Sequence, residues 1–175
     1  MLDALLLKLT GPVLDAVARR LALNALGLAV LGFAIGLAAL PVIVMKMYLP
    51  GLALFALSRP VSALAAASAR QSGQDEIVVT AFDAICFAGV PFAFALADPS
   101  RALAAVFLMF GLAARLASAL LSTRSLIGNT EILIAVAIAC AFPDRFGIVA
   151  YVLGVLFFVA AGGRIAARIA QRRTP

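Results

Sequence analysis

Two charged residues, Arg59 and Asp83, stand inside long apolar stretches of the sequence. By a helix rise of about 1.5 Å per residue, Arg59 lies about 16 Å from Arg70, and Asp83 lies about 12 Å from Asp75. A charge at such depth in a bilayer costs on the order of 3 kcal/mol and requires a partner. We therefore predict that Arg59 and Asp83 pair across two neighbouring antiparallel helices, directly or through water. The pair marks either a polar substrate cavity open to the cytoplasm or an ion pair that only fixes the register of the helices.

Other charged groups stand closer to the ends of apolar stretches. Glu131 follows Arg124 by seven residues, and its shallow position favours a place in the same cavity over simple extension to the interface. Arg164, Arg168 and Arg172 recur every four residues and so share one face of a helix. A topological anchor is the favoured role for this row, and contact with lipid phosphates is the alternative.

The composition indicates that lipid surrounds most of this chain. Of its 175 residues, 65% are hydrophobic and 13% are charged, whereas a soluble domain is about half apolar and about a quarter charged. Histidine, the commonest catalytic base and metal ligand, is missing from the sequence. Cys86 and Cys140 lie far apart in apolar stretches, which favours buried structural roles. The net charge of +6 comes from basic residues at the ends of apolar stretches, which favours anionic lipid over nucleic acid as a partner.

The apolar pattern predicts an all-α integral membrane protein. Residues 1–20 have apolar side chains at spacings of three and four, typical of an interfacial amphipathic helix. Residues 21–168 then form a transmembrane domain, and residues 169–175 form a basic cytoplasmic tail. Apolar stretches of about 20 residues can each span a bilayer. Six such spans are predicted, at 22–41, 48–69, 75–97, 101–122, 126–143 and 146–168.

The distribution of Lys and Arg predicts the orientation. Ten basic residues flank one set of span ends, and three flank the other. By the positive-inside rule, both termini are cytoplasmic. The opening residues carry acidic side chains and no small-residue cleavage site, so we do not expect a secretory signal peptide. A bacterial inner membrane is the expected location. Gly32 and Gly36 form a GxxxG motif that is suited to close helix packing.

The stretch RPVSALAAASARQSGQDEIVVTAFDAICFAGVP, residues 59–91, resembles the signature of the CDP-alcohol phosphatidyltransferases. That signature reads D-x-x-D-G-x-x-A-R, then eight or nine residues, then G-x-x-x-D-x-x-x-D. Aligned on Ala69-Arg70 and on the segment 88–91, the chain keeps the last aspartate as Asp83. The other three aspartates are replaced by Ser62, Ala65 and Val79. The segments LDAVARR and GNTEILIAVAIACAFP are also similar to family segments.

The resemblance implies an interfacial helix, six spans and a cytoplasmic polar cavity. Family members hold a divalent metal that neutralises the diphosphate of a CDP-linked lipid donor, and the last aspartate deprotonates the acceptor alcohol. By this alignment Asp83 is the candidate catalytic residue, and no metal ligand set is expected. Mg²⁺ or Mn²⁺ would need a displaced site at Asp75, Glu76 and Asp83. The candidate substrate-binding residues are Arg59, Ser62, Arg70, Asp75, Glu76 and Glu131.

Two principal functions remain open at this point. The first is a CDP-alcohol phosphatidyltransferase-type protein of phospholipid head-group synthesis. The second is a non-catalytic, lipid-binding or accessory subunit of a membrane complex, which the replaced aspartates favour. A small transporter is a third alternative, against which the missing internal repeat argues. The expected partners are phospholipids, a CDP-linked lipid donor in the first case, and a second copy of the chain or a larger membrane complex.

Overall fold

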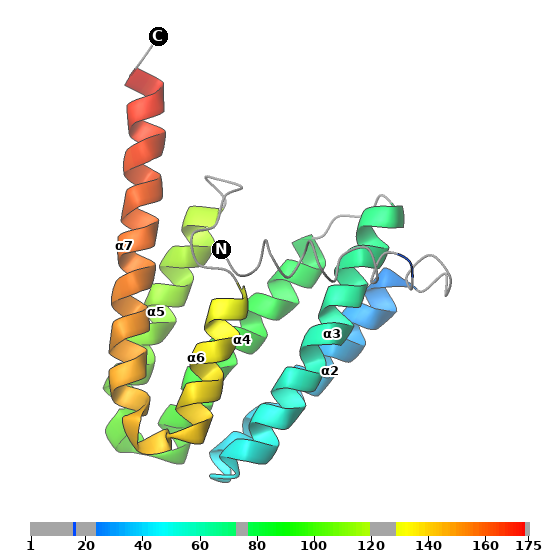
Figure 1. Cartoon of the computed structure of the whole chain (residues 1–175), viewed down its shortest axis with the longest axis vertical. Coiled ribbons are helices and arrows are strands. Elements are labelled where there is room, and N and C mark those ends of the chain that lie inside the picture. The colour runs from blue at the N-terminus through cyan, green and yellow to red at the C-terminus, as the bar shows by residue number, and fades with distance from the viewer. Residues whose placement is uncertain (1–15, 17–23, 73–76, 120–128, 174–175) are drawn as a thin grey trace.

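The computed structural model describes Ala16 and residues 24–72, 77–119 and 129–173, and the regular elements in these ranges are all helical. The predicted all-helical class is thus confirmed over this part of the chain. In order, the elements are α2 (Ala25–Val44), α3 (Tyr48–Ser72), α4 (Ile77–Ala97), the 3₁₀ helix η1 (Pro99–Arg101), α5 (Ala102–Ala119), α6 (Asn129–Ala141), the 3₁₀ helix η2 (Pro143–Arg145) and α7 (Phe146–Arg173) (Figure 1).

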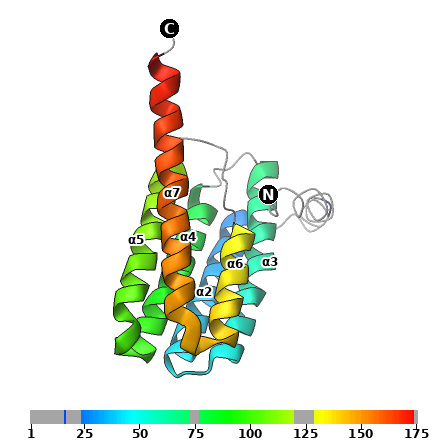
Figure 2. The same ribbon diagram turned by 60° about the vertical axis from the view of Figure 1, so that its left-hand side comes forward.

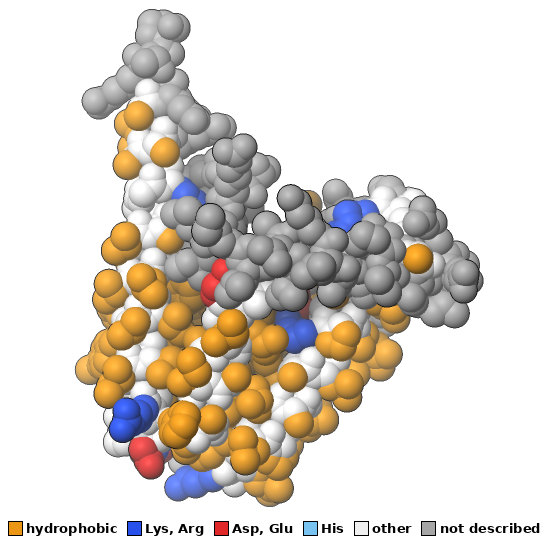
Figure 3. All heavy atoms as spheres, viewed as in Figure 1, with side chains coloured by type: hydrophobic (Ala, Val, Ile, Leu, Met, Phe, Trp, Pro, Cys, Tyr) orange, Lys and Arg blue, Asp and Glu red, His pale blue; other side chains and the backbone are white. Residues whose placement is uncertain are grey.

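Within the described ranges, five helices are long and apolar enough to cross a membrane, namely α2, α3, α4, α5 with η1, and α7 with η2. Helix α6 is apolar but has 13 residues. At about 1.5 Å per residue, it measures about 20 Å against a hydrocarbon core of about 30 Å. The predicted span at 126–143, the fifth of the six, is therefore described only in part, and the predicted interfacial helix lies outside the described residues apart from Ala16. Apolar side chains cover the flanks of the bundle, as lipid contact requires (Figure 3).

Three tight connections lie together at one end of the bundle, the lower end in Figures 1 and 2. They join α2 to α3, α4 to α5 and α6 to α7. Arg101 links the last two, because its Nη1 donates to the Pro143 carbonyl at 2.7 Å and its Nε pairs with Asp98 at 2.9 Å. Asp98 also accepts hydrogen bonds from the backbone N–H and hydroxyl of Ser100, at 3.1 and 2.7 Å. This network fixes the connected ends of the helices relative to one another.

Helix α2 separates α3 from α4 over most of their length. It packs extensively against both, whereas α3 and α4 contact each other only sparsely. The expectation that α3 and α4 are direct neighbours is therefore wrong, although the two helices are antiparallel (Figure 1). The predicted packing role of the GxxxG motif explains the arrangement. A Cβ at Gly32 would lie 2.9 Å from Ser62 Oγ of α3, and one at Gly36 would lie 2.8 Å from Cys86 Sγ of α4.

Helix α7 is the longest element and packs mainly on α5. It runs to Arg173, past the predicted span end at 168, and projects beyond the other helices (Figure 1). Arg164 is 8% exposed, so this member of the predicted basic row faces the protein rather than lipid head groups. The short helix α6 packs on α3 and α7. Helices α2, α3 and α4 together position the charged pair.

Candidate functional site

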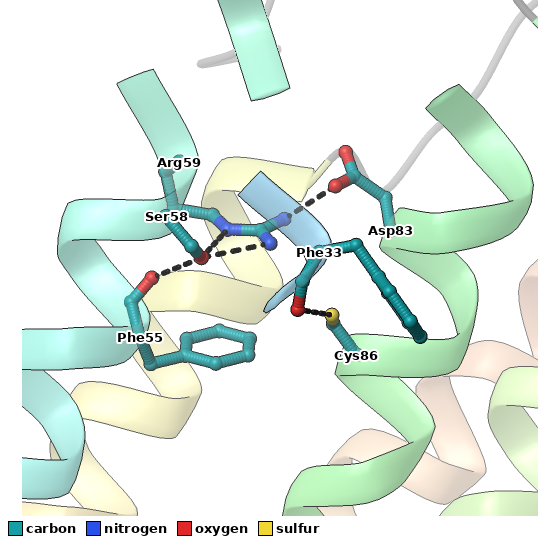
Figure 4. Close-up of polar contacts among 6 residues, drawn as sticks. All are labelled: Phe33, Phe55, Ser58, Arg59, Asp83 and Cys86. Carbon is teal, nitrogen blue, oxygen red and sulfur yellow. Dashed lines mark hydrogen bonds and ion pairs between the residues drawn. The ribbon is translucent and has the colours of Figure 1, made fainter. Parts of the chain in front are cut away.

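The predicted pairing of Arg59 with Asp83 is confirmed. Arg59 Nη1 lies 3.0 Å from Asp83 Oδ1, and the two side chains are 13% and 17% exposed (Figure 4). Arg59 comes from the middle of α3, and Asp83 lies six residues into α4. Because α2 packs between these helices over most of their length, the long arginine side chain is suited to bridge them. An ion pair in such surroundings gains more from Coulomb attraction than one in water.

Ser58 holds the other edge of the guanidinium. Its Oγ accepts from Arg59 Nε at 3.1 Å and from Nη2 at 3.0 Å, and its hydroxyl donates to the Phe55 carbonyl at 2.6 Å. These bonds fix the plane of the guanidinium against the α3 backbone (Figure 4). The rings of Phe55 and Phe87 each lie 4.9 Å from Arg59 Cζ and 5.5 Å from each other, so two adjoining aromatic rings make cation–π contacts with the guanidinium.

The guanidinium keeps hydrogen-bonding capacity after these contacts. Arginine has five N–H donors, and the three bonds to Ser58 and Asp83 use three of them. No further oxygen atom of the described residues accepts from them, although the Cys86 thiol lies beside the guanidinium. The second oxygen of Asp83 likewise has no donor in those ranges. The pair is therefore able to bind an anionic oxygen while it remains joined.

A second set of contacts supports Asp83 from the α2 side. Cys86, one turn after Asp83, places its Sγ 3.9 Å from the Phe33 carbonyl of α2 (Figure 4). The Phe33 ring stacks on Phe82 of α4 at a centroid distance of 4.7 Å. These contacts explain the buried structural role predicted for Cys86, which is 1% exposed.

The other candidate substrate-binding residues lie on α3 and α6 or outside the described residues. Ser62 is buried and lies against Gly32 of α2. Arg70 is exposed near the end of α3, and Glu131 is half-buried in the first turn of α6. Asp75 and Glu76 lie outside the described residues, so a displaced site that uses them stays a prediction.

Two of the positions at which the resemblance places metal ligands meet in one apolar cluster. Ala65 of α3 and Val79 of α4 are 0% and 7% exposed and share this cluster with Ala29 of α2. Leu28, Ala66 and Phe82 pack around it. Divalent cations of the Mg²⁺ class require several oxygen ligands, and the alkyl side chains here offer none. Among the described residues, no three His, Cys, Asp or Glu side chains come together. These residues do not fit a divalent metal.

Phe55, Ser58 and Phe87 belong to the site but were not predicted from the sequence. Phe55 and Phe87 each lie four residues from a charged member of the pair, on the same helix face. That spacing is the signal that could have identified them. Serine and phenylalanine recur throughout these helices, so their spacing stands out only once the ion pair is taken as fixed.

Comparisons with protein-family models, with curated proteins and with solved structures found no match to this chain.

Proposed function

We propose that this protein is a non-catalytic phospholipid-binding membrane protein on a scaffold like that of the CDP-alcohol phosphatidyltransferases. One observation carries the proposal. Ala65 and Val79, which stand where the resemblance expects metal-binding aspartates, belong to one buried apolar cluster together with Ala29 of α2. The convergence supports a related arrangement of helices, and the alkyl side chains argue against the metal-dependent transfer reaction. Asp83 alone cannot replace the set of aspartates that holds the metal in that family.

The Arg59–Asp83 pair is the proposed contact for the lipid phosphate. A guanidinium matches the geometry of phosphate oxygens, and Ser58 and Asp83 supply the oxygen acceptors of Arg59 within the described ranges, which use three of its five N–H donors. Its side chain is 13% exposed, so it is reachable without unfolding the bundle. Ser58 and the two phenylalanine rings hold the guanidinium in place before the ligand arrives, which reduces the entropy lost on binding.

The topology within which this site works is part of the proposal. We infer an interfacial helix followed by six spans, with both termini in the cytoplasm of a bacterium-like cell. The end that carries the three tight connections then faces away from the cytoplasm. That end holds Lys46, Arg101 and Arg145, offset by Asp98 and Asp144. The excess of basic residues lies at the opposite end, as the positive-inside rule requires.

A transfer assay tests the catalytic part of the proposal. Purified full-length protein is incubated with CDP-diacylglycerol, candidate acceptor alcohols and Mg²⁺ or Mn²⁺, and released CMP is measured. We expect no release above that of the Asp83→Asn variant. Metal-dependent release that disappears in Asp83→Asn would establish the enzyme alternative instead.

Lipid binding is measured separately by native mass spectrometry of the protein with phosphatidylglycerol. We expect Arg59→Gln to weaken retention of the lipid. Arg145→Gln is the matched control, because Arg145 is exposed at the connected end and should leave retention unchanged. Equal loss in both variants, or in neither, would contradict a phosphate contact at Arg59. The predicted protein partner is a second copy of the chain or a larger membrane complex. The same mass spectra would detect either of them.

A further inference from the structure

The C-terminal segment of α7, residues 164–173, continues the helix beyond the rest of the bundle (Figure 1). At about 1.5 Å per residue, the stretch from Phe146 through Gly163 measures about 27 Å, close to the hydrocarbon thickness of about 30 Å. By the same rise, the segment adds about 15 Å. A straight α7 that begins at one edge of the hydrocarbon core therefore places this segment outside the core at the other edge.

An apolar face of the segment is exposed. Ile165 and Ile169 lie one turn apart and are 45% and 50% exposed, and Ala166 and Ala170 beside them are exposed as well. Figure 3 shows apolar side chains along this projecting part of α7. Ile169 lies about 9 Å beyond Gly163 by the helix rise. A straight α7 would therefore hold apolar surface outside the hydrocarbon core, which is unfavourable.

Another face of the segment is basic. Arg164 is 8% exposed and faces the bundle. Arg168 and Arg172 follow it at steps of four residues, which places them on the same face of the helix. With Arg173, the segment contains four arginines and no acidic residue. An apolar face and a basic face on one helix are typical of segments that lie in the plane of an anionic membrane surface.

Two adjacent glycines precede the segment. A Cβ at Gly162 or Gly163 would meet no described atom within 4 Å, so close packing does not require glycine at these positions. Gly154 of the same helix differs, because a Cβ there would lie 2.6 Å from the ring of Phe107. Glycine weakens a helix relative to alanine, and sharp bends in helices occur at such small-residue pairs. The pair lies where α7 reaches the edge of the hydrocarbon core.

We propose that α7 bends at Gly162–Gly163 and that residues 164–173 lie on the surface of a bilayer that contains anionic phospholipid. Because Arg164 faces the bundle, Ile169 points away from it, and a bend away from the bundle turns Ile169 toward the hydrocarbon. The arginines of the segment then lie near the lipid phosphates, which attract them. This membrane contact goes beyond the phosphate contact proposed at Arg59 and does not depend on it.

Tryptophan fluorescence tests this location. The chain has no tryptophan, so Ile169→Trp gives the full-length protein a single reporter. The protein is reconstituted in vesicles of phosphatidylcholine brominated near the top of its acyl chains, with or without phosphatidylglycerol. We expect phosphatidylglycerol to increase the quenching and shift the emission to shorter wavelength, and high salt to reverse both changes. Val159→Trp is the matched control, because Val159 is 67% exposed within the span and should be quenched equally in all these conditions.

Two double variants test the bend and the charges separately, each combined with the reporter at position 169. Gly162→Ala with Gly163→Ala should favour the continuous helix by about fivefold for each replacement and so reduce the quenching in vesicles with phosphatidylglycerol. Arg168→Gln with Arg172→Gln should remove the salt-sensitive part of the quenching. In both variants, a reporter at position 159 instead should keep its signal, which shows that the span is intact.

Several outcomes would overturn the proposal. Long-wavelength emission from position 169 without quenching would show that the segment stays in water. Short-wavelength emission without quenching by the brominated lipid would show that protein, such as a second copy of the chain, covers the isoleucines. Equal quenching with and without phosphatidylglycerol would contradict the anionic lipid, and unchanged quenching in the double alanine variant would contradict the bend. Arg59→Gln should leave the signal at position 169 unchanged, so this test is independent of the proposed function.

Discussion

Two regions on the same three helices differ in whether they contain charged side chains. In the first, Arg59 of α3 and Asp83 of α4 form an ion pair with Ser58. In the second, Ala65 and Val79 of those helices meet in an apolar cluster. At about 1.5 Å per residue, the regions are about 9 Å apart along α3 and about 6 Å apart along α4. Helix α2 contributes Gly36 beside the first and Ala29 within the second.

The difference shows what a carboxylate needs in order to persist within this bundle. Asp83 has a fixed cation within hydrogen-bonding distance, and that cation is itself held by a hydroxyl and two rings. Carboxylates at positions 65 and 79 would enter one buried apolar cluster that has no cation among its described members. Without a metal, their desolvation and mutual repulsion would be unfavourable. Alanine and valine remove that cost and keep the helices packed.

The largest effect should come from breaking the ion pair on one side. Asp83→Leu leaves a buried guanidinium, which cannot lose its proton, and should destabilise the fold by about 3–5 kcal/mol. Arg59→Met should cost less, because the remaining carboxyl group can become neutral by taking up a proton. Unfolding in mixed micelles by denaturing detergent measures both.

The double variant Arg59→Met, Asp83→Leu is the control for this comparison. It removes both charges, so its loss of stability should be smaller than that of Asp83→Leu alone. Equal losses in the double variant and in Asp83→Leu would mean that packing, and not the pairing of charges, determines stability at this site.

The next effect should come from placing a charge in the apolar cluster. Val79→Asp should destabilise the fold by on the order of 3 kcal/mol, the cost of an ionised side chain within a bilayer. Val79→Ile keeps the cluster apolar and serves as the control, with a smaller loss from overpacking. The same unfolding measurement applies.

In the double variant Ala65→Asp, Val79→Asp, added Mn²⁺ should recover part of the stability, and no recovery would show that the two positions cannot share a cation.

The sequence predicted the ion pair because charges are so few. Only Arg59 and Asp83 lie deep in apolar stretches, so counting residues from the helix ends was enough to match them. The surroundings of Ser62 could not be predicted, because the resemblance assigns a role to the position but does not say which helix it faces. In the structure Ser62 lies against Gly32 of α2. The rings beside Arg59 could not be chosen from among the 12 phenylalanines in the chain.

Which helices lie side by side could also not be predicted from the sequence pattern. Periodicity places apolar residues on almost every side of these helices, so no single face points to a neighbour. Consecutive order suggested that α3 and α4 touch, whereas the small residues of α2 bring that helix between them. The GxxxG motif predicted close packing, but a motif on one helix does not name its partners.

A smaller effect should come from the glycine that supports the ion pair. In Gly36→Ala the new Cβ would lie 2.8 Å from Cys86 Sγ and 3.4 Å from Ser58 Oγ. We expect a loss of about 1–3 kcal/mol through overpacking. Gly27→Ala is the matched control on the same helix, because its nearest neighbour would be an Asn24 carbon at 3.8 Å. Alanine there should stabilise the helix by up to about 1 kcal/mol. The same sign in both variants would contradict a close approach at Gly36.

The smallest effect should come from a carboxylate that lies outside the spans. The hydroxyl and the backbone N–H of Ser100 lower the pKa of Asp98, and the charges of Arg101 and Lys46 add to this shift. A lowered folded-state pKa means that the contribution of Asp98 is present above the unfolded value, about 3.9 for aspartate. It is lost as the pH falls below that value through the folded-state pKa. This side chain is exposed to solvent, so the change should be small beside that of Asp83.

Melting temperatures of the native protein and of Asp98→Ala, followed from about pH 6 to about pH 3, measure that contribution. We expect the native protein to be the more stable at the upper end, and the two curves to approach each other below about pH 4. Taking the difference between the variants removes the effect of the other carboxyl groups, which titrate in both. A constant difference over the whole range would mean that Asp98 acts through the shape of the η1 turn. If Asp98→Ala lost as much stability as Asp83→Leu, charges inside and outside the membrane would not differ in their contribution to the fold.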